Sequence, residues 1–371
     1  MGVFGIGTLC AAPVNFREHT IATDLTGGYQ VVACDLNHDG RLDLIALSSG
    51  MTDLTWFENP TWERHVIASH LHGMINLAAW DIDDDGIPEI VLAHEFSMRA
   101  QESAGVISLL THNGDPRGPW NIREIDRLPT SHRLRWADVD GSGQKVLVNA
   151  PLIGAHAEAP NYRDHVPLVY YSPGDWKRRT IDDSLRGLVH GLTITEDGIL
   201  TAGFNGIMRY QRGQDGKWNR TLLASGDPSP WPKSGASDVA VGRLDNDKFI
   251  AAIEPWHGNQ VAVYRPQGST WRREVIDDTI VDGHTILTAD LAGDGHDEIL
   301  VGFRGQPQRV YIYSFDGRWN RQTLEDGGVS AAACAVADLN GDGRPDIACI
   351  GSATHNLKWY ENLGSLKSIR Q

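Results

Sequence analysis

The chain of 371 residues contains few cysteines, no long apolar run and no excess of basic charge. Four cysteines are too few for a disulfide framework in a chain of this length, so we expect buried free thiols. No apolar run reaches transmembrane length, and residues 1–13 lack the basic start of a signal peptide. The formal net charge of −15 argues against nucleic acid as a partner, because phosphates require a basic surface. These features predict neither a membrane nor a nucleic-acid partner, and they leave the compartment open. The four cysteines are Cys10, Cys34, Cys334 and Cys349.

The sequence also lacks the short motifs of several enzyme classes. It contains no nucleophile elbow, no P-loop, no dinucleotide fingerprint after a strand and no HExxH zinc motif. Only Glu95 and Glu254 are attractive candidates for the paired carboxylates of glycoside hydrolysis. We therefore expect neither an organic cofactor nor an obligatory protein partner.

What the chain does contain is a repeated unit. Seven times an aromatic residue opens a short strand, followed by polar residues and then an aliphatic one, and the gaps between these aromatics run from 42 to 58 residues. This period is typical of β-propeller blades with four strands each. The pattern predicts an all-β fold in which residues 1–371 form a single seven-bladed propeller. The aromatics are Phe16, Trp62, Trp120, Trp176, Trp218, Trp271 and Trp319.

The two ends of the chain predict how the ring closes. Residues 16–22 read as the last strand of a blade that nothing precedes, and residues 358–362 read as a third strand before the chain stops. We expect the N-terminal strand to complete the C-terminal blade. Such closure hides the sheet edges and brings loops from every blade to a common mouth.

Five blades carry an acidic turn between their first and second strands, and two of these turns are complete. Alternating acids around a glycine bend resemble a calcium loop, because hard cations prefer several oxygen ligands. The alternative is that the side chains bond only the amides of their own turn. A divalent cation, Ca²⁺ before Mg²⁺ or Zn²⁺, is the predicted cofactor, with a stabilising role. Its candidate ligands are Asp35, Asn37, Asp39, Asp43, Asp338, Asn340, Asp342 and Asp346.

Connectivity places a group of histidines on the opposite face. Some begin channel-lining first strands and others follow second strands, and both places lie away from the acidic turns. A structural role, bonding a neighbouring backbone, is the alternative for each one. Blades one, five and seven lack a histidine at the start of the first strand, and this uneven distribution favours a one-sided site. The predicted catalytic residues are His72, His94, His132, His190, His257, His284 and Arg133.

Other side chains are expected near this mouth and are predicted to contact a carbohydrate substrate. Imidazoles suit proton transfer near neutral pH, and arginines hold carboxylates in a bidentate manner. Together they suit proton abstraction next to a carbonyl or carboxylate, followed by β-elimination. The predicted substrate-binding residues are Glu95, Trp231, Trp256, Asn259, Arg304 and His355.

Two resemblances add to this interpretation. The acidic turns resemble FG-GAP/VCBS-type repeats, which indicate a fold and not a function. The segments 132–134, 188–190, 231–244, 257–259 and 284–295 resemble the propeller domain of aldos-2-ulose dehydratases, and single-propeller rhamnose–glucuronate lyases look like relatives. The likeness is weaker in blades one, two and seven.

The resemblance implies elimination chemistry. Because the chain ends after the propeller, we expect any isomerase step of the larger dehydratases to be missing. The first hypothesis is a carbohydrate lyase acting at a glucuronate residue, with Arg133 or Arg304 holding the carboxylate. A dehydratase acting on a keto- or anhydro-sugar is the second, and a non-catalytic glycan-binding propeller is the third.

Overall fold

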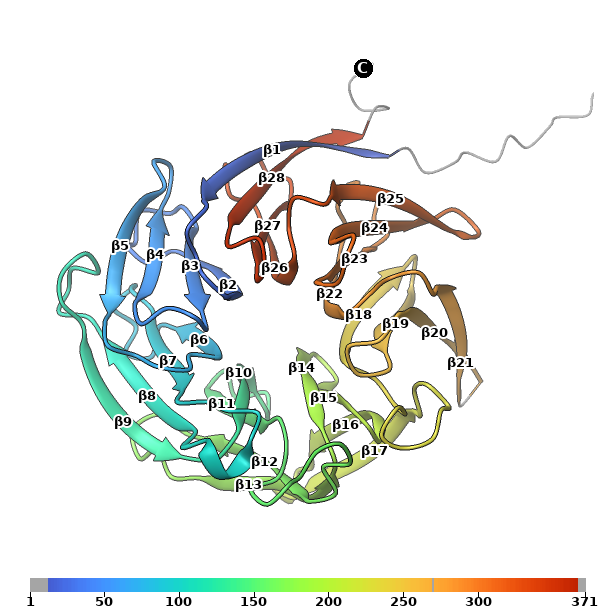
Figure 1. Ribbon diagram of the computed structural model, residues 1–371, viewed down its shortest axis with the longest axis horizontal. Helices are drawn as coiled ribbons and strands as arrows, with labels where there is room; N and C mark the ends of the chain where they lie inside the picture. The colour runs from blue at the N-terminus through green and yellow to red at the C-terminus, as the bar shows by residue number, and fades with distance from the viewer. Residues whose placement is uncertain (1–12, 269, 366–371) are drawn as a thin grey trace, which may run out of the picture.

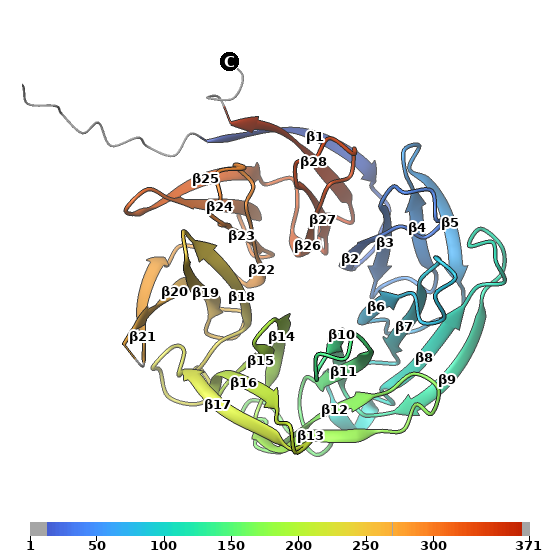
Figure 2. The ribbon, with the colours of Figure 1, turned by 180° about the vertical axis from the view of Figure 1, so that it is seen from behind.

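The computed structural model describes residues 13–268 and 270–365, which form a ring of seven four-stranded antiparallel blades (Figure 1). The first strand of each blade lines the centre, and the chain then moves outward (Figures 1 and 2). This confirms the predicted all-β seven-bladed propeller. No helix in the described ranges is long and apolar enough to span a membrane.

The strands follow one order in every blade. Blade one comprises β2 (Gly28–Cys34), β3 (Asp43–Ser48), β4 (Leu54–Glu58) and β5 (Glu63–Ala68), and blade two comprises β6 (Asn76–Trp80), β7 (Glu89–His94), β8 (Val106–Thr111) and β9 (Asn121–Arg127). Blade three comprises β10 (Ser131–Asp138), β11 (Lys145–Pro151), β12 (His165–Tyr171) and β13 (Arg179–Arg186). Blade four comprises β14 (Val189–Thr195), β15 (Gly198–Gly203), β16 (Gly206–Arg212) and β17 (Trp218–Ala224). Blade five comprises β18 (Asp238–Leu244), β19 (Asp247–Glu254), β20 (Gln260–Gln267) and β21 (Thr270–Asp277). Blade six comprises β22 (Gly283–Ala289), β23 (Glu298–Phe303), β24 (Arg309–Phe315) and β25 (Trp319–Asp326). Blade seven comprises β26 (Ala331–Ala337), β27 (Asp346–Gly351), β28 (Leu357–Ser365) and β1 (Val14–Ala22). A short 3-10 helix, η1 (Ala100–Glu102), lies in the connection after β7.

The ring closes as the repeat pattern predicts. Strand β1 pairs antiparallel with β28, with Phe16 opposite Asn362 and His19 opposite Trp359. The N-terminal strand is thus the outermost strand of the C-terminal blade (Figure 1). This pairing joins the two ends of the chain and holds the circle that carries the mouth.

The hydrophobic core is divided among the spaces between adjacent blades. One cluster joins Leu36 and Trp56 of blade one to Leu77 of blade two, and equivalent clusters recur around the ring. The repeated aromatics insert here: Trp319 lies edge-on to Phe249 of the preceding blade, with ring centroids 5.4 Å apart. Second strands such as β3 and β7 are buried throughout, because neighbouring blades cover both of their faces.

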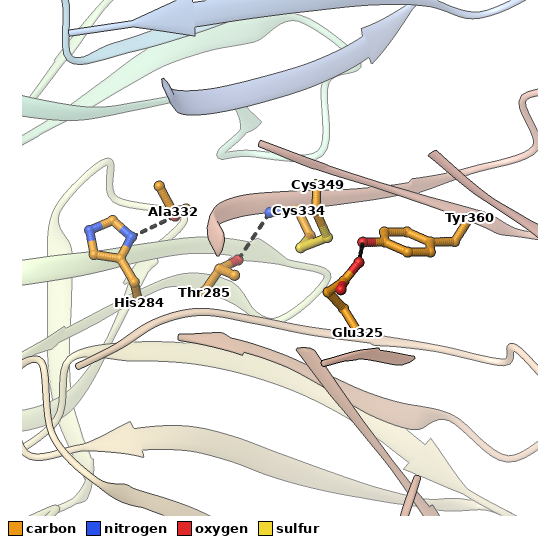
Figure 3. Close-up of a disulfide and its surroundings, with 7 residues drawn as sticks. All are labelled: His284, Thr285, Glu325, Ala332, Cys334, Cys349 and Tyr360. Atoms are coloured by element: carbon orange, nitrogen blue, oxygen red, sulfur yellow. Dashed lines mark hydrogen bonds between the residues drawn. A yellow bond between two sulfur atoms is a disulfide. The ribbon is translucent and has the colours of Figure 1, made fainter. Parts of the chain in front are cut away.

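The expectation of free thiols is wrong for two of the cysteines. Cys334 and Cys349 form a disulfide (Figure 3). They lie directly opposite each other on β26 and β27 with Cα atoms 4.1 Å apart, and such facing pairs bring two side chains together. Cys34 is a free, half-buried thiol, and Cys10 lies outside the described residues.

Candidate active site

The histidines and the acidic turns lie at opposite ends of the same strands. His132, His190 and His284 stand at the starts of β10, β14 and β22, whereas acidic turns follow the ends of β10 and β22. Six residues, from His132 to Asp138 and from His284 to Asp290, separate the two layers by about 20 Å, at about 3.3 Å per residue. The two faces predicted from connectivity are therefore distinct.

Four histidines from four consecutive blades meet at the mouth. The ring centroid of His190 lies 5.0 Å from those of His132, His257 and His284. The Nε2 atoms of His190 and His257 are 3.4 Å apart. These are the four imidazoles at the centre of the predicted catalytic set, and we call them the histidine cluster.

In three of these rings, Nδ1 has a partner outside the cluster. Nδ1 of His190 lies 3.1 Å from the carbonyl oxygen of Ser237, and Nδ1 of His284 lies 2.5 Å from that of Ala332 (Figure 3). A neutral imidazole has one N–H, and a carbonyl can only accept, so both rings carry their proton on Nδ1. Their Nε2 atoms are then acceptors on the opposite side of each ring.

His257 is held by a carboxylate. Its Nδ1 lies 3.1 Å from Oδ1 of Asp282, whose two oxygens also accept hydrogen bonds from Arg304, each at 3.1 Å. Arg304 Nη2 also lies 3.0 Å from His257 Nδ1. Nδ1 of His257 therefore either donates to Asp282 or accepts from Arg304, and the two partners together fix the orientation of the ring. His257 itself has a left-handed backbone, with φ of 48°.

The electrostatic environment keeps the cluster uncharged. Burial lowers the pKa of His132, His190 and His284 well below the usual value, and nearby arginines lower it further. The pKa of His257 is also lowered, mainly by burial, although Asp282 opposes the shift. Burial acts to raise the pKa of Asp282, but hydrogen bonds from His257 and Arg304 outweigh it and lower the pKa. Neutral imidazoles offer lone pairs to protons or metals.

Three of the imidazoles have the arrangement of a metal site. One nitrogen each of His190, His257 and His284 lies within 4.8 Å of the other two. Nε2 of His284 is buried and has no hydrogen-bond partner. Three neutral histidines, with Nδ1 held by carbonyl or carboxylate groups, can hold a divalent ion such as Zn²⁺ and leave a position open.

The fourth imidazole pairs with a tyrosine of blade one. Nε2 of His132 lies 2.8 Å from the hydroxyl of Tyr29, and Nδ1 of His132 is buried without a partner. The guanidinium of Arg133 lies over the Tyr29 ring, 5.8 Å from its centroid, and its Nη2 lies 3.4 Å from Nε2 of His190. Tyr29, Arg133 and His284 line a central cavity of about 340 Å³.

Aromatic side chains from the mouth-side loops cover the cluster. Phe96 packs against His132 with ring centroids 5.6 Å apart, and Trp256 packs against His257 at 4.7 Å. Tyr162, from the long connection after β11, lies edge-on to Trp256. Since these residues come from the connections after β7, β11 and β19, loops of blades two, three and five form one wall of the site.

Several predicted residues lie outside the cluster. His94 is buried but contacts Ser108, with Nε2 and Oγ 3.0 Å apart. His72 is exposed, and the exposed His355 accepts a hydrogen bond from the Gly27 amide at 3.2 Å. The others make local contacts on the mouth side: Glu95 with Arg127, Asn259 with the Asp278 carbonyl, and Trp231 with the Asn161 carbonyl and the Arg163 guanidinium.

The acidic turns show the backbone bonding that the sequence leaves as an alternative. Asp35 accepts hydrogen bonds from the amides of Asp39 and Gly40, and Asp338 does the same for its own turn. Asp43 is fully buried and accepts from the amides of Leu36 and Asn59, while burial raises its pKa to about 6. Asp346 accepts hydrogen bonds from the amides of Leu339 and Asn362 in the same way. Of the remaining predicted ligands, Asn37 is half-buried, whereas Asp39, Asn340 and Asp342 are exposed in their turns. The calcium prediction stays a prediction.

Two residues of the site were missed from the sequence. Asp282 lies in the crossing between blades five and six, and Tyr29 stands where other blades place a histidine. An acid two residues before His284 was the available signal for Asp282. Tyr29 gave no such signal, because only the circular fold brings a residue of blade one to a residue of blade three at the mouth.

The comparisons with known proteins find two families of propeller sequences. Residues 104–267 match the family model described as the β-propeller domain of aldos-2-ulose dehydratase, and residues 35–92 and 290–349 match FG-GAP-like repeats. The first range contains His132, His190 and His257. The chain resembles the aldos-2-ulose dehydratase propeller. That resemblance, predicted from the sequence, is confirmed.

A curated relative extends the match. The chain is 28% identical over 269 residues to the aldos-2-ulose dehydratase of Phanerodontia chrysosporium. The alignment covers 61% of this chain and 29% of that protein, so the chain spans less than a third of the dehydratase. The comparisons thus relate this chain, at the level of a protein family, to a dehydratase whose name indicates a carbohydrate substrate.

Proposed function

We propose that this propeller is a carbon–oxygen lyase that removes water from a keto-sugar by β-elimination at the histidine cluster. The observation that carries the proposal is the convergence of four neutral imidazoles with Arg133 and Tyr29. The match to the dehydratase propeller supports a sugar as substrate.

Three histidines of the cluster would hold a divalent ion. His190, His257 and His284 present nitrogen, which favours Zn²⁺ over Ca²⁺, because calcium prefers oxygen ligands. A bound ion supplies a Lewis acid that polarises the substrate carbonyl. The chain's own contribution is to hold these rings neutral and oriented through Ser237, Asp282 and Ala332.

The remaining groups carry out the proton transfer. His132, bonded to the Tyr29 hydroxyl, removes the proton from the carbon next to the carbonyl and returns it to the leaving hydroxyl. The C–H and C–O bonds break, a C=C bond forms, and water leaves. The Arg133 guanidinium neutralises the enolate oxygen that develops between these events.

One observation favours a second candidate, a lyase acting at a glucuronate residue. The contacts of Arg133 are with the Tyr29 ring and an imidazole, whereas the Arg304 guanidinium is taken up by Asp282. Arg133 makes no ion pair within the described residues, and such a guanidinium suits the carboxylate of a uronic acid. The elimination step would be the same, with a sugar leaving instead of water.

A product assay tests and separates these functions. The Zn²⁺-loaded protein is incubated with an aldos-2-ulose or with a glucuronate-containing oligosaccharide, and the ultraviolet absorbance of the unsaturated product is followed. We expect product from the first substrate, and a His132→Gln variant should be inactive. The exposed mouth-side His72 is the matched control, and His72→Gln should retain activity. Binding of a sugar without any product would contradict both enzyme proposals and favour the glycan-binding function.

A further inference from the structure

The residue Arg209 on β16 breaks a pattern that the other six blades keep. The third strands can be aligned on one residue that lies opposite an aliphatic residue of the second strand, such as Tyr210 opposite Ile199 in blade four or Phe57 opposite Leu44 in blade one. The third-strand residue that immediately precedes this reference residue faces the space shared with the next blade. The residues at this position, from blade one to blade seven, are Trp56, Leu109, Tyr170, Arg209, Val263, Ile312 and Trp359. Six are hydrophobic and one is a cation.

Within the part of the chain that the structure describes, the Arg209 side chain has no hydrogen-bond or ion-pair partner. Every other arginine of residues 13–268 and 270–365 that is not exposed donates to a carboxylate, a carbonyl or another side chain. Arg209 is half-buried, and its Nε is fully buried without a hydrogen bond. A buried donor without a partner costs stability, so an apolar residue would serve packing better at this position.

The space around Arg209 is open. Two cavities, of about 450 and 510 Å³, lie between blades four and five, and both are lined by Arg209, Leu223 and Trp271. The first also reaches the shortened turn of blade four, where β14 and β15 are joined by Glu196 and Asp197 alone. The loss of a full acidic turn here leaves room beside the guanidinium.

The charged groups nearby are already paired. Glu196 and Asp197 bind Lys248, and Glu196 also binds Arg243, whose amide donates to Asp297. Arg273, at the other end, donates to Glu254. No carboxylate of the described residues is within ion-pair distance of Arg209. Its positive charge is therefore left for a group from outside the chain.

We propose that the groove formed by these two cavities between blades four and five binds a small carboxylate-bearing molecule, with Arg209 holding the carboxylate. A guanidinium takes two oxygens of a carboxylate or another oxyanion at once. Leu223 and Trp271 supply an apolar wall for the rest of the ligand, and the hydroxyls of Thr221 and Thr270 line the same groove. This site lies apart from the histidine cluster and does not depend on the proposed reaction.

Thermal unfolding with added anions tests the proposal. The melting temperature of the full chain is measured with sodium glucuronate, sodium sulfate and sodium chloride at equal ionic strength. We expect a saturable rise with glucuronate beyond that with chloride. A rise with sulfate alone would place a free inorganic oxyanion at Arg209 and overturn the organic ligand. No rise with either salt would overturn the site.

Variants locate the effect. Arg209→Met should remove the response, and Arg209→Lys should weaken apparent affinity about tenfold, because lysine cannot bind in a bidentate manner. Arg123→Met, which removes an exposed positive charge from β9, is the matched control and should respond like the wild type. His190→Gln should also respond fully, since its site is separate. A full response in Arg209→Met would overturn the proposal.

The ligand-free variant provides a second readout. Without anions, Arg209→Met should unfold at the same temperature as the wild type or higher, because it restores the apolar pattern of the other blades. A fall of several degrees would mean that the guanidinium stabilises the blades by itself. That result would overturn the assignment of Arg209 to ligand binding.

Discussion

The Nε2 atoms of His190 and His257 lie 3.4 Å apart, although the two residues are 67 positions apart in the chain. His190 directs its Nδ1 proton at the carbonyl of Ser237, so its Nε2 lone pair faces Nε2 of His257. Two imidazole nitrogens at this distance share either the Nε2 proton of His257 or a bound cation. The zinc prediction below depends on this relationship.

Zinc should bind to the purified protein at about one ion per chain. His284→Gln should lower the occupancy at least tenfold, because it removes one of three nitrogen ligands. Metal content after dialysis against trace Zn²⁺ measures this. Asp39→Asn, which changes an acidic turn on the opposite face, is the control. Equal zinc content in His284→Gln and the wild type would exclude the three-histidine site.

Tyr29→Phe should lower turnover by about 10²-fold while leaving the melting temperature within a few degrees. The change removes only the hydroxyl bonded to His132, and general acid–base groups contribute about 10²–10⁴-fold. Rates with an aldos-2-ulose, measured by product absorbance, test it. Unchanged kcat would mean that Tyr29 takes no part in proton transfer.

The dependence of stability on pH should change when His132 is replaced. Its folded pKa lies below the unfolded value of about 6.5, so below that pH the unfolded chain binds an extra proton and the free energy of unfolding falls. One such histidine contributes up to about 1.4 kcal/mol per pH unit. Glu298 acts in the opposite sense, since burial raises its pKa to about 7. Only a comparison of variants therefore isolates the histidine.

Urea unfolding from pH 8 to pH 5 provides that comparison. His132→Gln should lose less stability on acidification than the wild type, and the exposed His72→Gln should follow the wild type. Identical pH profiles for all three proteins would contradict the lowered pKa.

Calcium should raise the melting temperature if the two complete acidic turns bind it. Asp39→Asn together with Asp342→Asn should abolish the effect, because each substitution removes a carboxylate ligand from one turn. Melting curves with Ca²⁺ or a chelator measure this. If Ca²⁺ leaves the wild-type curve unchanged, the turns are stabilised by their own amide bonds alone.

Reduction of the disulfide should destabilise the last blade. Cys334 and Cys349 are 15 residues apart, and a loop of that length corresponds to about 3 kcal/mol in the chain-entropy account. Melting of Cys334→Ser/Cys349→Ser against the wild type tests it, with Cys34→Ser as the control for loss of a thiol. A double variant as stable as the wild type would contradict this expectation.

The residues show why the fold was predictable and the site only partly so. The repeated aromatics and the single N-terminal strand at residues 16–22 are local patterns. Each copy of the repeat carries such a pattern within its own stretch of sequence, so the pattern can be recognised without knowing the contacts between blades. His132, His190 and His284 could be placed at one mouth because each begins a channel strand. His94 could not be excluded, because connectivity gives the end of a strand and not the direction of its side chain.

The sequence by itself determined the circular architecture, its closing strand and the separation of imidazoles from acidic turns. Only the tertiary structure decided that Tyr29 meets His132, that Asp282 holds His257, and that Cys334 joins Cys349. The first set depends on the spacing of apolar residues and turns along the chain. The second depends on register and on side chains brought together by ring closure, and a linear pattern does not encode these contacts.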